Sequence, residues 1–252
     1  MTTINDILNF FESFAPLESA MDFDNCGLLV GDKDTPVSKA LVSLDITTDV
    51  VNEAEKLGCE LIISHHPVIF SPVRQIAESS PVYSLISKGI AAVCMHTNLD
   101  LSEKFGVNTC LAKAVGLSEV RRSAHGECMF VGKLNRTTPT AEFVKSVKSA
   151  LDCNGLRYTE IKGEVKTVAL CSGSGGDQIF AAAEENADAL LTGEIKHHEI
   201  NAANTLGINI IDAGHFKSED IVILPLIKKL SEEFEGVLFT KSTTYNDFIK
   251  FA

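Results

Sequence analysis

Histidines and carboxylates follow three predicted strands of this chain of 252 residues. They are His65 and His66 after the apolar run 61–63, His96 and Asp100 after the run 91–95, and His215 and Glu219 after the run 208–211. In open α/β sheets, ligands bind outside the carboxyl ends of the strands. Imidazoles and carboxylates without neighbouring thiolates suit Zn, Mn, Fe, Ni or Co better than Ca or Mg. The pattern therefore predicts a metal site.

The adjacent pair His65-His66 bears on the number of ions. Pro67 biases His66 toward an extended backbone, in which successive side chains point to opposite sides. If both rings are ligands, we expect two ions to flank this turn, with carboxylates bridging them. The alternative is that one ring is a ligand and the other orients a ligand by hydrogen bonding.

The elements around these residues alternate between strand and helix. An amphipathic helix opens at Ile4 and ends before Pro16, and the region 40–63 reads as strand, helix and strand. Thr138-Pro139-Thr140 starts a further helix that stops near Asn154-Gly155. Such alternation predicts an α/β fold with mostly parallel strands.

The chain also resembles itself. A shift of 128 places lays residues 37–66 over 165–194 without a gap, and a shift of 118 lays 89–95 over 207–213. A duplication explains the pattern, and chance recurrence of helix and strand patterns is the alternative. We expect two interlinked α/β units, residues 1–125 and 126–252, with the metal site between them and the C-terminal part returning to complete it.

Composition excludes some classes of function. The 22 Lys and Arg against 34 Asp and Glu give a net charge of −12, which argues against nucleic-acid binding by bulk charge. No apolar run approaches the roughly 18 residues of a membrane span. The first twenty residues carry acidic and no basic side chains, unlike a signal peptide, so we expect a cytoplasmic protein. The seven cysteines include no C-x-x-C pair, and we expect them to act as small buried hydrophobes.

Several motifs together resemble the Nif-three-like family, whose members are often labelled GTP cyclohydrolase I type 2 homologues. They are His65-His66-Pro67, the segment from His96 to Asp100, Gly214-His215 with Glu219, the segment 24–31 (DNCGLLVG), and Thr192-Gly193-Glu194. The resemblance covers essentially the whole chain. One departure is Phe23, where the family often has Trp.

The resemblance implies two interlinked α/β domains, a dinuclear metal centre and assembly as a homohexamer. Carried over by motif, the ligands of two divalent ions per subunit are His65, His66, Asp100, His215 and Glu219, with Glu219 as the bridge. His96 lies one helical turn before Asp100 and is either a sixth ligand or a residue that orients a ligand. Glu194 takes the place of His66 in the internal repeat, which indicates a vestigial or supporting role near the centre. Glu194 and His96 are also the candidates for proton transfer.

The leading hypothesis is a hydrolase in which two ions share a bridging hydroxide that attacks an anionic substrate. A nucleotide or another phosphorylated heterocycle is the substrate class that the resemblance implies, with ring-opening hydrolysis like that of GTP. The alternative is a metal-binding, metal-delivery or regulatory interaction protein without turnover. A third reading, purely structural metals, is disfavoured because a chain of this length buries a sufficient core unaided.

Other polar residues have plainer interpretations. His197 and His198 are expected on a solvated helix face, and His125 on the surface. The segment 172–177 (SGSGGD) follows a predicted strand and opens a helix, so it is a tight turn or, as the alternative, a phosphate-binding loop. It lacks the Lys of a P-loop and the third Gly of a dinucleotide fingerprint.

Overall fold

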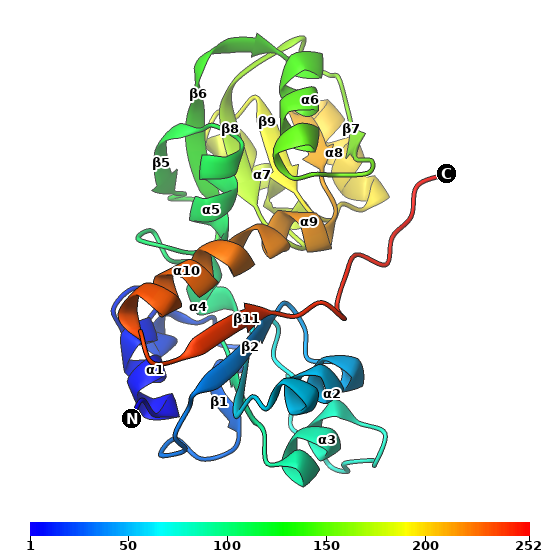
Figure 1. Ribbon diagram of the computed structural model, residues 1–252. Coiled ribbons are helices and arrows are strands. Elements are labelled where there is room, and N and C mark those ends of the chain that lie inside the picture. Colours follow the sequence, from blue (N-terminus) through cyan, green and yellow to red (C-terminus); the bar gives the residue numbers. More distant parts are fainter. The chain divides into compact units, whose positions relative to one another are not determined.

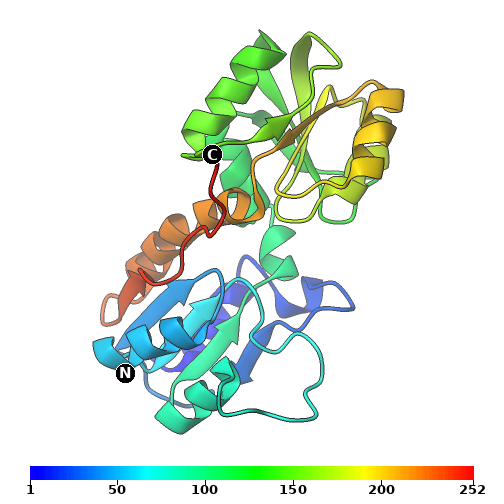
Figure 2. The same cartoon turned by 90° about the vertical axis from the view of Figure 1, so that its right-hand side faces the viewer.

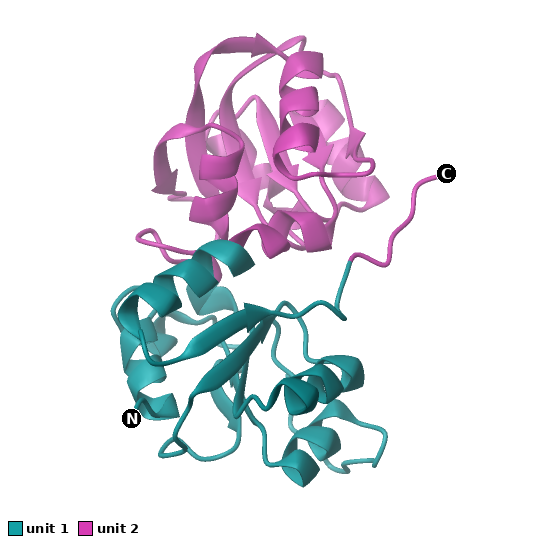
Figure 3. Ribbon diagram, in the orientation of Figure 1, with its two compact units in different colours: residues 1–99, 223–246 teal, residues 100–222, 247–252 magenta.

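The computed structural model describes residues 1–252, and its contacts divide the chain into two compact units (Figure 3). Unit 1 is residues 1–99 with 223–246, and unit 2 is residues 100–222 with 247–252. This division differs from the one expected from the sequence, in which the boundary lies between residues 125 and 126. The reason is a long-range strand pairing: β11 (Leu238–Lys241) lies parallel to β2 (Lys39–Ser43), so the last strand completes the first sheet.

Unit 1 contains a five-stranded sheet in the order β1-β4-β3-β2-β11. The four strands from β4 to β11 are parallel to one another, and β1 pairs antiparallel with β4 at the edge. The other elements are β1 (Gly27–Val30), β3 (Leu61–Ser64), β4 (Ala91–Cys94), α1 (Ile4–Glu12), a 3₁₀ turn at Leu17–Ser19, α2 (Thr48–Leu57), α3 (Pro81–Lys88) and α10 (Ile223–Glu233). The short helix α4 (Thr97–Asp100) leads out of this unit.

Helices cover both faces of this sheet. Figure 1 shows α2 and α3 on one side and α1 and α10 on the other. Leu41, Ile62 and Ala92, from three adjacent strands, belong to the buried core that includes α2 and α3. Their neighbours along the strands are buried as well, as expected for strands covered on both faces.

Unit 2 contains a six-stranded sheet in the order β5-β6-β8-β9-β10-β7. Its centre, β8-β9-β10, is parallel, and the outer pairings are antiparallel. The strands are β5 (Ser118–Arg122), β6 (Phe130–Pro139), β7 (Arg157–Tyr158), β8 (Glu164–Cys171), β9 (Ala189–Thr192) and β10 (Asn209–Asp212). The helices are α5 (Val107–Ala114), α6 (Thr140–Ala150), α7 (Ile179–Glu184), α8 (His197–Leu206) and α9 (His215–Glu219), with 3₁₀ turns at Gly176–Gln178 and Asp220–Val222.

Two separate cores flank the sheet of unit 2. The core on one face includes residues of α5 and α6, and the core on the other includes residues of α7 and α8. Figure 2 shows helices on both sides of this sheet. The fold is therefore α/β in both units, with parallel strands at the centre of each sheet, which confirms the predicted fold class.

The internal repeat is present in the strand registers. Residues 40–43 of β2 pair with 61–64 of β3, and residues 168–171 of β8 pair with 189–192 of β9, each 128 places later. Residue 61 pairs with 91, and residue 189 pairs with 209, which is 118 places after 91. The agreement extends to register, which chance recurrence of helices and strands does not require, and supports the duplication.

Helix ends repeat in the same way. Gly58 after α2 and Asn186 near the end of α7 both have positive φ, 69° and 55°. Gly89 after α3 and Gly207 after α8 have φ of 66° and 71°. These are the left-handed conformations that end helices, and glycine or asparagine adopts them at the lowest energy.

Four of the cysteines are buried and three are half-buried, and all seven are free. The expectation of buried cysteines therefore holds for Cys59, Cys94, Cys153 and Cys171. None of the helices combines the length and the apolar character needed to cross a membrane.

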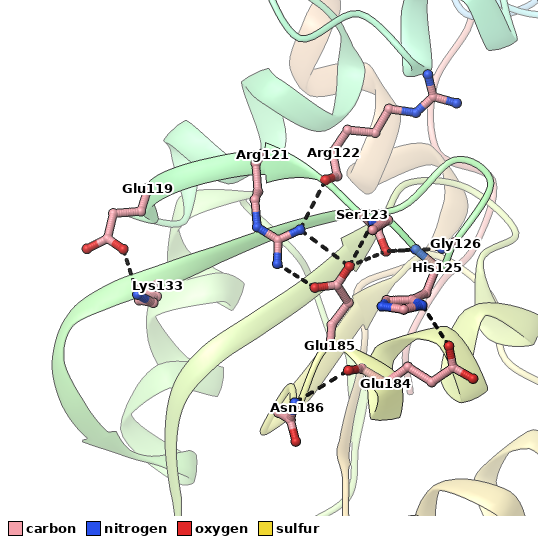
Figure 4. A network of polar contacts seen from close by, with 11 residues as sticks. Glu119, Arg121, Arg122, Ser123, His125, Gly126, Lys133, Glu184, Glu185 and Asn186 are labelled. Atoms are coloured by element: carbon pink, nitrogen blue, oxygen red, sulfur yellow. Dashed lines mark hydrogen bonds and ion pairs between the residues drawn. The ribbon is translucent and has the colours of Figure 1, made fainter.

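A polar network ties the end of α7 to the segment that follows β5 (Figure 4). The carboxylate of Glu185 accepts hydrogen bonds from Arg121, from Ser123 Oγ at 2.7 Å and from the backbone N–H of Ala124 at 2.8 Å. The bond from Arg121, together with those from Ser123 and Ala124, lowers the pKa of Glu185 to about 2. His125 lies on the surface, as predicted, with Nδ1 at 2.8 Å from Glu184.

Candidate metal centre

Three imidazoles of unit 1 form a cluster at the carboxyl ends of β3 and β4. We call His65, His66 and His96 the histidine cluster. Their ring centroids are 5.0 to 5.5 Å apart, and each ring offers a nitrogen within 4.8 Å of one on each of the others. Such a group can hold a metal ion.

The expectation that His65 and His66 point to opposite sides of an extended segment does not hold. Their ring centroids are only 5.0 Å apart. The backbone N–H groups of His65 and His66 donate to the backbone oxygens of Ser43, the last residue of β2, and Leu44, which follows it. Successive amides of a regular strand point in opposite directions, so the pleat has ended at this turn.

Each ring of the histidine cluster is oriented through Nδ1. His65 Nδ1 lies 2.9 Å from the backbone oxygen of Met95, and His66 Nδ1 lies 2.9 Å from Asp45 Oδ2. His96 Nδ1 lies 2.9 Å from Asp24 Oδ1. An oxygen acceptor requires the proton on Nδ1, and in the neutral ring this leaves the lone pair on Nε2. Metal-binding histidines share this arrangement.

The side chain of Asp24 is buried in this environment. Burial raises its pKa, but hydrogen bonds from His96 and Thr97 outweigh that effect and hold the pKa well below its usual range. Thr97 donates to Oδ2 from both its backbone N–H, at 3.0 Å, and its Oγ1, at 2.5 Å. Asp24 is therefore an ionised carboxylate that keeps His96 in one orientation.

A second group lies in unit 2, and we call Glu194, His215 and Glu219 the His–Glu cluster. His215 and Glu219 are four residues apart on α9, so they share one face of the helix. His215 Nε2 lies 3.0 Å from Glu219 Oε2, and His215 Nδ1 lies 2.8 Å from Glu194 Oε1. The carboxylate of Glu219 is buried, while that of Glu194 is exposed.

Asp100, at the end of α4, is buried and is tied to the loop after β8. Ser172 Oγ donates to Asp100 Oδ1 at 3.4 Å, and Asn108 Nδ2 donates to the backbone oxygen of Asp100 at 3.2 Å. Asn108 Oδ1 in turn accepts from the backbone N–H of Ser172 at 2.9 Å. Asn108 therefore fixes Asp100 relative to the start of the segment 172–177, which we call the glycine-rich loop.

The glycine-rich loop makes room for the His–Glu cluster. Gly173 has φ of +61°, and a Cβ there would lie 2.2 Å from Glu219 Oε1. A Cβ on Gly193 would lie 2.5 Å from Ser218 Oγ and 2.7 Å from the Cα of His215. The two glycines are joined by a backbone hydrogen bond of 2.9 Å. Gly173 in this loop and Gly193 after β9 therefore allow the close approach of α9.

The remaining histidines are exposed. His197 and His198, at the start of α8, are exposed, which confirms the expected solvated face. The interpretation from sequence missed Asp45, which orients His66. Asp45 follows the apolar run 40–44 directly, so the rule about strand ends that selected the histidines would have selected it too.

Comparison with known proteins gives one consistent family. A model of the Duf34/NIF3 (NGG1p interacting factor 3) family matches residues 2–247. A protein of Clostridium perfringens (strain 13 / Type A) named GTP cyclohydrolase 1 type 2 homolog is 33% identical over 244 residues, which cover 92% of this chain and 93% of that protein. A second protein with this name, from Clostridium acetobutylicum, is 31% identical over 250 residues, 93% of this chain and 90% of its own.

Solved structures agree in fold. A hypothetical protein of Staphylococcus aureus is 27% identical, with a TM-score of 0.91 and coverage of 99% of both chains. A Bacillus cereus protein related to NIF3 also has a TM-score of 0.91, over 100% of this chain and 99% of that chain, and at 23% identity it bears on the fold alone. The resemblance seen in the motifs is thereby confirmed: the chain belongs to the Duf34/NIF3 family.

Proposed function

We propose that this protein holds two divalent metal ions per subunit through His65, His66, Asp100, His215 and Glu219, and that it is a hydrolase. The observation that carries the proposal is that four imidazoles are each oriented by an oxygen atom at Nδ1. His65, His66 and His96 in unit 1 and His215 in unit 2 all have Nδ1 within 2.8 to 2.9 Å of an oxygen. The surface residue His125 makes the same kind of contact, so the contact alone is not distinctive. It favours metal ligation here because three of the four rings form one cluster and His215 adjoins the buried carboxylate of Glu219.

The donor set fits such ions. It consists of imidazole nitrogens and carboxylate oxygens, which suit Zn, Mn, Fe, Ni or Co. Asp100 and Glu219 are buried carboxylates, and buried carboxylates are generally paired with a cation or hydrogen-bonded. That Asp100 and Glu219 share one dinuclear centre with the histidines is what the family resemblance implies. The structure supports the proposal through the arrangement of the ligands within each unit.

When bound, two divalent ions activate a water molecule for attack and stabilise the negative charge that develops on the substrate. The protein's own groups prepare the site. Asp45 and Glu194 hold the protons of His66 and His215 on Nδ1. The buried carboxylate of Asp24 does the same for His96, so that His96 Nε2 can accept a proton from the nucleophile and return it to a leaving group.

The substrate class follows from the relatives' names. A nucleotide or another phosphorylated heterocycle is proposed, with ring-opening hydrolysis as the reaction, because several relatives are named GTP cyclohydrolase 1 type 2 homolog. A homohexameric assembly is part of the proposal through the family resemblance. A cytoplasmic location is part of the proposal as well.

The test combines elemental analysis with an activity assay. Protein purified under metal-replete conditions is expected to contain two ions per subunit and to convert members of a panel of nucleotides and phosphoesters. His65→Ala and Glu219→Ala are each expected to lose metal and turnover. His198→Ala is the matched control, since this histidine is exposed, and it is expected to behave as wild type.

The outcomes separate the alternatives. Two ions without turnover of any compound would assign the protein to metal delivery or regulation. Fewer than two ions per subunit would contradict the dinuclear centre. A large loss of thermal stability on chelation, in a protein without turnover, would indicate structural metals.

A further inference from the structure

Two phenylalanine rings lie exposed beside the histidine cluster. Phe23 is 59% exposed and Phe70 is 50% exposed. Their ring centroids are 6.2 Å apart, and Phe70 lies edge-on to His96 at 6.4 Å. Exposed phenylalanines are common singly, but a contacting pair of rings next to a polar cluster resembles the wall of a ligand site.

The segments that carry both rings belong to the framework that orients His96. Phe23 directly precedes Asp24, whose carboxylate accepts from His96 Nδ1. On the other side, Asn25 Nδ2 donates to the backbone oxygen of Ile69 at 2.6 Å, next to Phe70. The segments carrying the two rings are therefore joined to each other and to His96. Because this order exists before a ligand arrives, the entropy lost on binding is smaller.

The geometry selects the shape of the ligand. The ring planes of Phe23 and Phe70 are tilted by 49°, which excludes a parallel sandwich around a third ring. A planar ring can instead stack on one phenylalanine and meet the edge of the other, and both arrangements are favourable for aromatic pairs. The nearby imidazole of His96 favours a ring whose edge carries nitrogen or oxygen atoms.

We propose that Phe23 and Phe70 form a subsite that binds the planar heterocycle of the substrate and places it beside the histidine cluster. A nucleobase has both the apolar face and the polar edge that this surface offers. The role in turnover rests on the proposed function, whereas binding of the ring is a property of these two side chains and can be measured without turnover.

The experiment uses the absence of tryptophan from the chain. Phe23→Trp introduces the single tryptophan of the chain as a fluorescent reporter in the proposed subsite, and guanosine 5′-monophosphate is the probe. Addition of the probe is expected to change the emission in a saturable way. Ribose 5-phosphate, which has the same phosphate and no heterocycle, is expected neither to change the emission nor to compete.

Second substitutions in the Phe23→Trp background test the partner ring. Phe70→Ala is expected to weaken binding of the probe roughly tenfold or more, in line with the loss of one base–aromatic stack. Phe70→Tyr retains an aromatic face and is expected to restore most of the affinity. Phe180→Ala is the matched control, because Phe180 is similarly exposed but lies on α7 in unit 2.

Metal content is measured on every variant, so that this inference and the proposed function fail separately. Loss of probe binding in Phe70→Ala with unchanged metal content supports the subsite, even if the protein turns over nothing. Probe affinity within twofold of the parent in Phe70→Ala overturns the subsite, whatever the metal content. Equal competition by ribose 5-phosphate overturns it as well. So does the absence of any response of Phe23→Trp to the probe; dissociation of an assembly by Phe23→Ala would then assign the rings to contact with a second copy of the chain.

Discussion

The two units build different polar sites on the same parallel scaffold. In unit 1, the residues after β2 and β3 include Asp45 and His66, and the carboxylate orients the imidazole. At the positions 128 places later, unit 2 has Gly173 and Glu194. Here the glycine makes room for Glu219, and the carboxylate orients His215, which comes from α9. The scaffold therefore specifies where polar groups gather, and a few substitutions decide whether a strand end supplies an imidazole or accommodates one.

The largest effect is expected at Gly173, the position in unit 2 that is equivalent to Asp45 in unit 1. Gly173→Ala places a Cβ 2.2 Å from Glu219 Oε1 at a φ of +61°. Displacing a buried carboxylate in addition to the left-handed strain should cost about 3 kcal/mol in unfolding free energy and reduce metal content. Urea unfolding and elemental analysis measure both. Gly207→Ala is the control, with φ of +71° and open space, and an equal cost in the two variants would refute the crowding.

Removing the orienting carboxylates tests whether the two units prepare their imidazoles in the same way. Asp45→Ala and Glu194→Ala are each expected to weaken metal binding about 10- to 100-fold, because His66 and His215 lose their Nδ1 acceptors. Metal titration against a competing chelator measures the affinity. Glu184→Ala is matched, since Glu184 accepts from His125 in the same geometry on the surface. An unchanged affinity in both cluster variants would remove the basis of the proposed function.

Helix ends provide a third contrast. Leu57 ends α2 and is exposed, while Glu185, 128 places later, is the carboxylate of the polar network in Figure 4. The pKa of Glu185 is lowered to about 2, chiefly by Arg121. Its stabilisation is thus present above the unfolded pKa and is lost as the pH falls toward 2. Glu185→Gln should cost about 1–2 kcal/mol at pH 7, and the difference from wild type should shrink between pH 5 and pH 2 in urea unfolding. A difference independent of pH would exclude the ionised carboxylate as its source.

The smallest effect is expected at equivalent helix caps. Gly89→Ala and Gly207→Ala, 118 places apart, have nearly the same φ and open space around the new Cβ. Each should cost about 1 kcal/mol, from the left-handed strain alone. Unfolding free energies that differ by more than about 0.5 kcal/mol would mean that the repeat does not extend to the energetics of these caps.

Local patterns predicted the elements and the repeat well. Apolar runs located β2, β3, β4, β8 and β10, because strands buried on both faces read as continuous apolar sequence. In the structure, Gly58, Gly89 and Gly207 cap the ends of α2, α3 and α8. The return of β11 to pair with β2 was not predicted, since pairing across about two hundred residues leaves no local signal in the sequence.

The candidate site was predicted in part for a similar reason. Residue type and strand ends selected His65, His66 and His96, which the structure brings together. Orientation could not be predicted, because it depends on the break in the pleat at His65 and on acceptors such as Asp45 that are distant in sequence. The role of Gly173 was also missed, since only the position of Glu219 shows what its absent side chain makes possible.

The parallel pairing of β11 with β2 has a consequence for synthesis on the ribosome. Unit 1 cannot complete its sheet until residues 100–222 have been translated, which takes on the order of ten seconds. During that interval β2 is an open edge whose backbone groups can pair with another nascent chain. The inserted unit, whose main segment is continuous, is therefore free to fold first, and the unit that begins the chain is the last to be finished.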